Sequence, residues 1–388
     1  QGKHDYAISK KADRPIEELD EKIVDLLRIG IHQIFEMRVS VHAAVGETVE
    51  VARAVAGESK ATYINAVLRS ISADLDIYND LESDANVSDL EKLSILYSHP
   101  IWIITAYYDQ LKDWDAVRDL LRKNNIPVAP HIVSWPGKST VSEILETGGE
   151  KLAIGTYSVL SNHLPNEYPA IKDKRAGIQD MGSQLVSEIF FATKNDTAQK
   201  WLDLCAGPGG KAALLHNLLQ VEKPNDGFLA NEPTQHRAEL VARVVPKNKI
   251  VSFDGRDFAS FNETYDRILI DAPCTGLGAL RRRPEARWRR SINDLKELLP
   301  LQRELIDSAY QMLNPGGIIG FVTCSPLLAE TKSQVLDAKY RHKDLSILDI
   351  SKYSPSGQTG VSDDGTMQLW THLDGSDSMF MALLQKSA

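Results

Sequence analysis

Two cysteines stand directly after apolar runs that are typical of buried strands. Cys274 closes the segment Asp271–Cys274, which follows Ile268–Ile270, and Cys324 follows the run Ile318–Val322. Neighbouring strand ends of a doubly wound sheet can face one crevice, and a thiolate there is a strong nucleophile for covalent catalysis. The alternative is that both are small buried apolar side chains, as free cysteines usually are. Their polar neighbours and nearby prolines favour a reactive pair.

A glycine-rich loop follows a third apolar run, Trp201–Leu204. The residues of this candidate cofactor-binding loop are Cys205, Ala206, Gly207, Pro208, Gly209, Gly210 and Lys211. Glycines let the backbone approach a ligand closely, and a helix that begins after them offers free N–H groups to an anionic moiety. The loop matches neither the dinucleotide pattern G-x-G-x-x-G nor the phosphate-loop pattern G-x-x-x-x-G-K-[ST]. We interpret Cys205 as part of the cofactor wall or the core, and not as a nucleophile.

Carboxylates end the strands that we expect to follow this loop. Glu232 comes after the run Gly227–Asn231 and can accept both hydroxyls of a ribose. Asp254 ends the next strand and can face an adenine amino group. Together the loop, Glu232 and Asp254 indicate an adenosine-containing cofactor, and S-adenosylmethionine fits better than NAD because the loop lacks the pyrophosphate pattern. The alternative is a glycine-rich turn beside two surface carboxylates. Asp271, which ends the strand after Asp254, is a further candidate for the cofactor site.

An arginine-rich segment follows Cys274, with six arginines between positions 281 and 290. Arginine binds phosphate bidentately, and tryptophan can stack on a nucleic-acid base. A run of charge is more often a solvated face, but this one borders the expected crevice. The candidate RNA-binding residues are Arg281, Arg282, Arg283, Arg287 and Trp288.

The elements that must position these residues fall into three blocks. Residues 1–80 are expected to be helical, residues 89–175 to form a small α/β module, and residues 176–388 to form an α/β domain. In the last block strand and helix signals alternate, which predicts a parallel sheet covered by helices on both faces. The acidic stretch 77–88 resembles a linker. Other expected elements are helices at 43–55, 61–71, 101–121, 141–146, 211–219 and 298–312 and strands at 128–135, 200–205, 227–231, 249–253, 267–271 and 317–323.

Composition excludes several classes of protein. The 388 residues include 44 basic and 53 acidic ones, a net charge of −9, and 43% of them are hydrophobic, which excludes global disorder. The acidic balance argues weakly against a non-specific polyanion binder but leaves a local RNA site open. No apolar run approaches the roughly 18 residues of a membrane span. Three cysteines without a C-x-x-C pair predict neither a disulfide framework nor a metal site. We expect a cytoplasmic monomer.

Taken together, the motifs resemble the RNA 5-methylcytosine methyltransferases, and the resemblance covers roughly residues 90–388. The segments that carry it are Cys205–Lys211, Asp271–Cys274, Thr323–Pro326 and Gln179–Gln184. The helical block, through Arg28–Gly30 and Asn65–Arg69, is similar to a NusB-like RNA-binding domain. That combination is similar to the RsmB/Sun subgroup, which modifies small-subunit (16S) ribosomal RNA. A full NusB-like domain has further helices, so we expect a truncated N-terminus.

The resemblance implies a Rossmann-like methyltransferase sheet, preceded by an all-α NusB-like domain and a small α/β module. It implies S-adenosylmethionine as the cofactor and ribosomal RNA as the partner. By resemblance, Cys324 attacks C6 of a cytosine, Cys274 assists release of the product, and Asp271 hydrogen-bonds the base. Lys211 would position the base or its phosphate.

Two other functions stay open from the sequence. One is a ribosome-assembly protein that binds RNA without catalysis, although both cysteines are present. The other is a methyltransferase for a different acceptor, which would need no pair of cysteines at strand ends.

Overall fold

The computed structural model describes residues 1–37 and 39–388. These form two compact units, Gln1–Thr105 and Ala106–Ala388. Among the described residues, no helix has both the length and the apolar character to cross a membrane.

The first unit is built from helices, as predicted. Its helices are α1 (Gly2–Lys11), α2 (Glu21–Phe35), α3 (Val41–Ala56), α4 (Glu58–Ser72), α5 (Asn79–Ser83) and α6 (Asp89–Tyr97). Asp20 caps α2 by accepting a hydrogen bond from the backbone N–H of Lys22. Leu27 and Ile31, one helical turn apart, are fully buried and pack in one core with residues of α4.

The prediction of a linker at residues 77–88 is wrong for its first half. Ile77, Tyr78 and Leu81 are buried, and Ile77 and Tyr78 belong to the core of the helical unit. Asp80 and Glu82 on the short helix α5 are exposed. The acidic residues hid the apolar face because a five-residue helix is too short to show a periodic pattern.

The predicted helix at 101–121 is two helices, α7 (Ile101–Leu111) and α8 (Trp114–Lys123). Lys112 between them has a positive φ of 53°. Asp113 then caps α8, because its carboxylate accepts hydrogen bonds from the backbone N–H groups of Asp115 and Ala116. The break comes from this local capping, which apolar spacing alone does not reveal.

A small antiparallel sheet forms the next module of the second unit. Its strands lie in the order β2-β3-β1-β4, with β1 (His131–Ser134), β2 (Glu150–Lys151), β3 (Ser158–Leu160) and β4 (Ala176–Ile178). Helices α9 (Val141–Glu146) and α10 (Pro169–Lys172) accompany it. Ile132, Ile144, Val159 and Tyr168 form its buried core.

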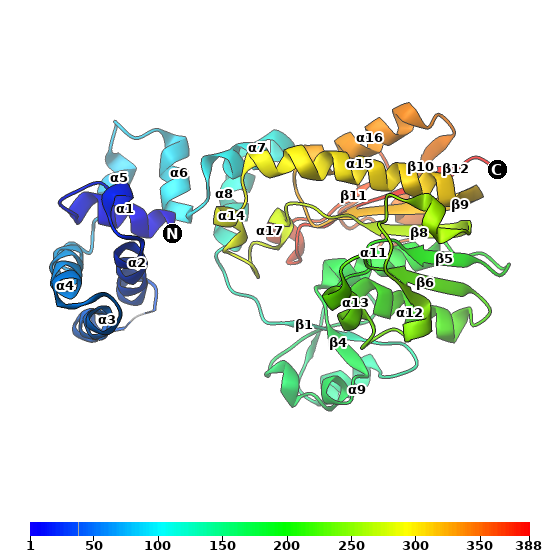
Figure 1. Ribbon diagram of the computed structural model, residues 1–388, viewed down its shortest axis with the longest axis horizontal. Helices are drawn as coiled ribbons and strands as arrows, with labels where there is room; N and C mark the ends of the chain where they lie inside the picture. The colour runs from blue at the N-terminus through cyan, green and yellow to red at the C-terminus, as the bar shows by residue number, and fades with distance from the viewer. Residues whose placement is uncertain (38) are drawn as a thin grey trace. The chain divides into compact units, whose positions relative to one another are not determined.

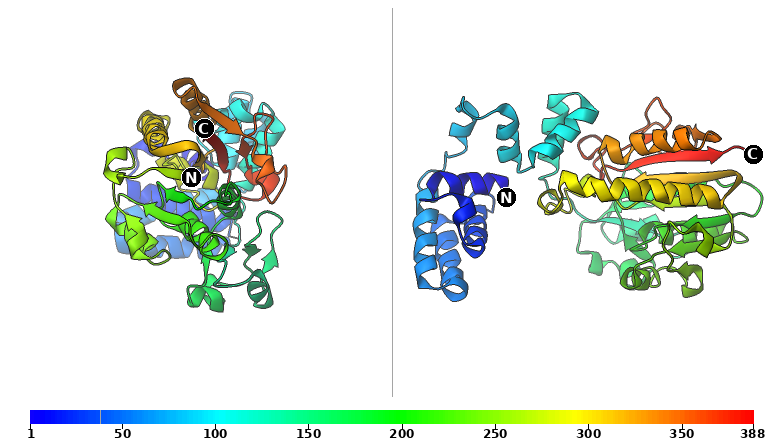
Figure 2. Two further views of the ribbon diagram at one scale, coloured as in Figure 1. Left: turned by 90° about the vertical axis from the view of Figure 1, so that its right-hand side faces the viewer. Right: turned by 45° about the horizontal axis from the view of Figure 1, so that its top comes forward.

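The large sheet has eight strands in the order β10-β12-β9-β8-β5-β6-β7, with β11 paired to β12. The strands are β5 (Lys200–Asp203), β6 (Gly227–Asn231), β7 (Ile250–Val251), β8 (Tyr265–Asp271), β9 (Leu313–Thr323), β10 (Leu345–Leu348), β11 (Met367–Gln368) and β12 (Phe380–Lys386). Five neighbouring strands, in the order β7, β6, β5, β8 and β9, run parallel to one another. β12 pairs antiparallel with β9, β10 and β11, so the sheet is mixed and not wholly parallel. In Figure 2 the red strand β12 lies inside this sheet.

Helices cover both faces of the large sheet (Figure 1). Alternate residues of β8 explain this, since Leu269 belongs to one buried cluster while Ile268 and Ile270 belong to the other. The helices of the first cluster are α11 (Met181–Ala192), α12 (Gly210–Glu222) and α13 (Gln235–Val241); those of the second are α15 (Leu295–Met312) and α16 (Lys332–Arg341). The carboxyl ends of the five parallel strands therefore meet at one edge, where ligands bind in open α/β sheets.

Candidate active site

A cavity of about 1000 Å³ lies at the carboxyl ends of β5, β6, β8 and β9. It brings together most of the residues singled out in the sequence. Those that line it are Cys205, Ala206, Gly207, Pro208, Gly210, Lys211, Glu232, Asp254, Asp271, Cys274, Arg282, Arg283 and Cys324. Gly209, Arg281, Arg287 and Trp288 do not line it.

The glycine loop connects β5 to α12 and packs tightly against Glu232. The backbone N–H of Gly207 donates to Glu232 Oε2 at 3.1 Å. A Cβ at position 207 would lie 2.1 Å from that same oxygen, so a side chain there would displace the carboxylate. Gly209 has a positive φ of 109°, which favours glycine. The loop is therefore shaped by backbone contacts that only glycine permits.

Glu232 and Asp254 differ in their surroundings although both follow parallel strands. The Glu232 side chain is only 3% exposed, and its Oε1 accepts from the backbone N–H of Thr234 at 2.9 Å. Arg237 lies beside it, with Nε 3.6 Å from Oε2. Asp254 is half exposed and paired with Arg256, whose hydrogen bond lowers the pKa of that carboxyl.

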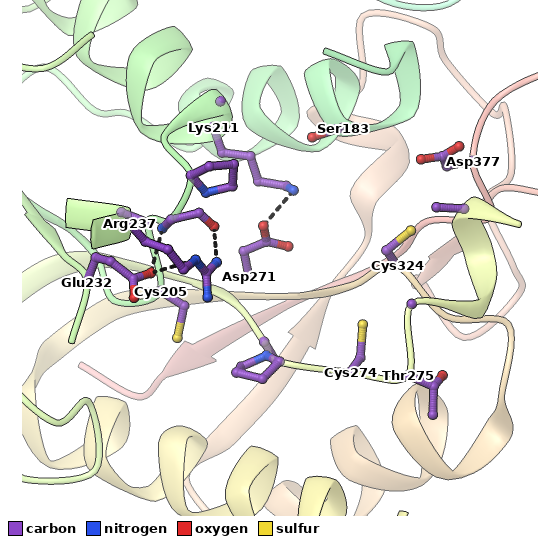
Figure 3. A pocket seen from close by; sticks show the side chains of 18 of the residues that line it. Ser183, Cys205, Lys211, Glu232, Arg237, Asp271, Cys274, Thr275, Cys324 and Asp377 are labelled. Carbon is purple, nitrogen blue, oxygen red and sulfur yellow. Dashed lines mark hydrogen bonds and ion pairs between the residues drawn. The ribbon is translucent and has the colours of Figure 1, made fainter. Parts of the chain in front are cut away.

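Lys211 and Asp271 form an ion pair in the cavity, with Nζ and Oδ2 2.8 Å apart (Figure 3). Burial acts to lower the pKa of Lys211, but the charge and hydrogen bond of Asp271 outweigh it, so the pKa is raised. Asp203 lies fully buried at the end of β5. Burial raises its pKa to about 7, the charge of Asp271 adds to the shift, and Lys211 opposes it.

Cys274 and Cys324 come from separate loops, after β8 and β9, and line the same part of the cavity (Figure 3). The loops are joined by a hydrogen bond from the Gly278 N–H to the Cys324 carbonyl at 3.0 Å. Burial and the charge of Glu330 raise the pKa of Cys274 to about 12.

The surroundings of the other two thiols differ in their nearby cations. Burial raises the pKa of Cys324, the Asp377 carboxylate adds to this, and Lys211 and Arg282 oppose it. Burial likewise raises the pKa of Cys205, and three carboxylates of the site (Asp203, Asp271 and Glu232) add to it, with only Arg237 opposing. Two cations near Cys324 favour its thiolate, whereas the carboxylates around Cys205 disfavour one.

The arginines of the segment 281–290 have different partners. Four of them bind within the protein: Arg281 donates to the Gly375 carbonyl, Arg282 pairs with Asp377, Arg287 donates to Asn125 and Arg290 donates to the Thr275 carbonyl. Arg287 is only 3% exposed. Arg283 and Arg289 line the cavity and are exposed, and their side chains have no hydrogen-bond or ion-pair partner in the described part of the chain.

Sequence reasoning missed Asp203, Glu330, Asp377 and Arg237 as parts of this site. Asp203 and Glu330 could have been found, because each is an acidic residue next to an apolar run. Asp203 lies at the end of β5, and Glu330 follows Leu327–Ala329. Asp377 carried no local signal, because its partners Arg282 and Asp180 lie far away in the sequence. Arg237 lies five positions after Glu232, but no motif marked it.

The family model described as 16S rRNA methyltransferase RsmB/F matches residues 189–385, just over half of the chain. The chain belongs to the RsmB/F family of 16S rRNA methyltransferases. A model of the NusB family matches residues 1–73 of this RsmB/F-family chain.

Individual relatives cover nearly the whole RsmB/F-family chain. A protein of Mycobacterium tuberculosis, named only as a methyltransferase, is 39% identical over 98% of this chain and 84% of its own. The ribosomal RNA small subunit methyltransferase B of Pectobacterium atrosepticum is 28% identical over 99% of this chain and 86% of its own. The crystal structure of PH0851 aligns with all of this chain and 87% of its own at 24% identity, with a TM-score of 0.80.

The RsmB/F-family chain is therefore an S-adenosylmethionine-dependent RNA methyltransferase that acts on ribosomal RNA. This confirms the predicted class of enzyme, its cofactor and its RNA partner. The prediction of a Rossmann-like sheet preceded by a NusB-like helical domain is confirmed as well.

Proposed function

We propose that this enzyme methylates C5 of a cytosine in small-subunit (16S) ribosomal RNA, with Cys324 as the covalent nucleophile. The observation that carries the proposal is the meeting of two thiols, from separate strand ends, in one cavity with the Lys211–Asp271 ion pair. A methyltransferase for an already nucleophilic acceptor would need neither thiol. A non-catalytic assembly protein would need no cavity lined by both.

The residues present fit S-adenosylmethionine. The glycine loop packed against the buried Glu232 and the cavity volume of about 1000 Å³ suit a nucleoside cofactor beside a base. We assign its binding to the loop Cys205–Lys211, Glu232, Asp254 and Asp271. When bound, the cofactor supplies an activated methyl group.

The chain's own residues make the acceptor carbon reactive. Cytosine C5 is a poor nucleophile, and attack of the Cys324 thiolate at C6 forms an S–C6 bond and turns the ring into an enamine. C5 can then accept the methyl group. Loss of the C5 proton restores the C5–C6 double bond, and the electron pair of the S–C6 bond returns to sulfur. Lys211 and Arg282 lie where their charges favour the thiolate.

Asp271 and Cys274 complete the assignment. Asp271 hydrogen-bonds the base at N3 or N4 and stabilises the charge that develops during attack, while Lys211 holds Asp271 in place. Cys274 assists the proton loss that lets Cys324 leave. The target base must be unstacked to reach these groups, which favours a looped RNA substrate. Residues 1–80 and 89–175 would hold the RNA around it.

The experiment that tests this function is methyl transfer from labelled S-adenosylmethionine to 16S ribosomal RNA, followed by nucleoside analysis. We expect label in 5-methylcytosine. Label in another nucleoside would contradict the assigned chemistry. No transfer to any RNA by protein that binds the cofactor would favour the assembly protein or a different acceptor.

Arg283 and Arg289 are the arginines of the segment that we expect to bind RNA phosphates, since the other four have partners within the protein. The double variant Arg283→Ala/Arg289→Ala should weaken RNA binding about tenfold at physiological salt. It should also lower the slope of log Kd against log salt by about 1 to 2.

A matched control removes two arginines elsewhere. Arg243 and Arg303 are outside the cavity lining, so Arg243→Ala/Arg303→Ala changes the net charge equally. Filter binding of a 16S fragment over a salt series measures both variants. Equal weakening by the two pairs would show that Arg283 and Arg289 contribute only general charge.

A further inference from the structure

The buried carboxylate of Glu330 lies between the two loops that carry the cysteines. Glu330 is fully buried, and so are Thr275 and Ser325, two of the polar side chains that donate to it. Thr275 directly follows Cys274 in the chain, and Ser325 directly follows Cys324. One carboxylate thus contacts both cysteine-bearing loops at the residue next to the thiol.

The two oxygens of Glu330 share these contacts. Oε1 accepts from the backbone N–H of Thr275 at 2.8 Å, and Oε2 accepts from its hydroxyl at 2.6 Å. Oε2 also accepts from the Ser325 hydroxyl at 2.6 Å. These short distances are typical of hydrogen bonds to an ionised acceptor, which are stronger than neutral ones.

A third contact extends the network to the other side of Cys274. Gln302 of α15 donates through Nε2 to Glu330 Oε1 at 3.2 Å and to the Pro273 carbonyl at 2.8 Å. The Cys274 loop is therefore held at Thr275, directly by Glu330, and at Pro273, through Gln302, which also contacts Glu330.

No Lys, Arg or His forms an ion pair with Glu330 within the described residues 1–37 and 39–388. A buried carboxylate without a cation is costly and persists only where hydrogen bonds satisfy it. A neutral side chain could fill the same space at lower cost. Glu330 meets the requirement for hydrogen bonds through Thr275, Ser325 and Gln302, which tie the two cysteine loops and α15 to one carboxylate.

We propose that Glu330 is a positioning residue for the methyl transfer, whose carboxylate fixes the Cys274 loop against the Cys324 loop so that both thiols meet one base. This inference rests on the proposed function, in which the thiols act in succession on the same ring. A displacement of about 1 Å in such an arrangement can cost about 100-fold in rate.

The charge of Glu330 also acts on Cys274, which provides a readout that packing alone would not move. The ionisable groups that act on Cys274 are Glu330 and Asp271, which raise its pKa, in addition to burial. The backbone N–H groups of Gly276 and Cys324 oppose them. Removing the charge of Glu330 while keeping its shape should therefore make Cys274 easier to ionise.

The first experiment needs no RNA and uses the full chain. The rate at which iodoacetamide alkylates each cysteine is measured by mass spectrometry over a pH series. The proteins compared are wild type, Glu330→Gln and Glu297→Gln. At about pH 8, Cys274 should react about threefold faster or more in Glu330→Gln, because the rate follows the thiolate fraction. Cys205 should stay within about twofold. Glu297→Gln, at an exposed position of α15, the helix that carries Gln302, should match wild type. An unchanged Cys274 profile in Glu330→Gln would overturn the proposal.

The second experiment measures turnover on RNA. Glu330→Ala should lower kcat about 100-fold, with the KM for RNA and the Kd for S-adenosylmethionine within about threefold of wild type. Glu330→Gln keeps an oxygen for the Thr275 N–H and an amide for the hydroxyls, so it should regain at least about tenfold of that loss. A folded Glu330→Ala enzyme with near wild-type kcat would overturn the proposal.

Two further cases need their own measurement: a Glu330→Ala variant that does not fold, and a wild type that forms no 5-methylcytosine. If Glu330→Ala does not fold, Ser325→Ala is used instead, because it removes only the contact on the Cys324 side. We expect its kcat to fall about tenfold with unchanged KM. An unchanged kcat would again overturn the proposal. If wild type forms no 5-methylcytosine, the proposed function fails, and the alkylation series alone then decides whether Glu330 acts on Cys274.

Discussion

Replacing Cys324 by alanine is expected to abolish methyl transfer while the Kd for S-adenosylmethionine stays within about twofold of wild type. Without the thiolate no S–C6 bond forms, and C5 of cytosine stays a poor nucleophile. Cofactor affinity should survive because the glycine loop and Glu232 belong to other strand ends. Methyl incorporation into 16S ribosomal RNA and calorimetric titration of the cofactor measure the two effects.

The control for this variant is Cys324→Ser, which keeps nearly the same volume. A serine hydroxyl is far harder to ionise than a thiol, so this variant should be equally inactive and equally able to bind the cofactor. Loss of cofactor binding in either folded variant would refute the assigned role, since it would place Cys324 in the cofactor site. Retained 5-methylcytosine formation would refute it as well.

Replacing Cys274 by alanine is expected to have the opposite signature, the accumulation of a covalent protein–RNA adduct. Cys324 can still attack C6, but release is slowed because the group that assists loss of the C5 proton is missing. Turnover should stop after about one equivalent. Denaturing gel electrophoresis of protein with labelled RNA, in the presence of S-adenosylmethionine, detects the adduct.

The double variant Cys274→Ala/Cys324→Ala is the matched control for this result. It lacks the attacking sulfur and should show no adduct at all. A Cys274→Ala enzyme that turns over freely would exclude Cys274 from product release. An adduct that persists in the double variant would exclude Cys324 as its point of attachment.

The partners of the arginines in the segment 281–290 could not be predicted from the sequence. Six arginines in ten residues indicated RNA, and the chain is an RNA methyltransferase. Yet Arg282 pairs with Asp377, which is 95 positions away, and Arg287 donates to Asn125, which is 162 positions away. Local composition cannot report such partners, so the segment resembled a uniform basic surface when most of it is tied into the protein.

The strands of the large sheet were likewise only partly predictable from the sequence. Parallel strands buried on both faces appear as continuous apolar runs, and β5, β6, β8 and β9 were visible for that reason. The β10, β11 and β12 strands add the antiparallel part of the sheet. Their pairing depends on the strand already beside them, and no local signal distinguished it.

By itself the sequence determined which groups can react and on what kind of framework. The thiols, the glycine loop and the carboxylates each stand at the end of an apolar run, and a parallel sheet brings such ends to one edge. Only the tertiary structure decided which side chains are free to act. It left the guanidinium groups of Arg283 and Arg289 without partners in the described residues, and it placed Glu330 between the two cysteine loops. Chemical type and spacing are properties of short segments, whereas burial, pairing and pKa arise from contacts between distant ones.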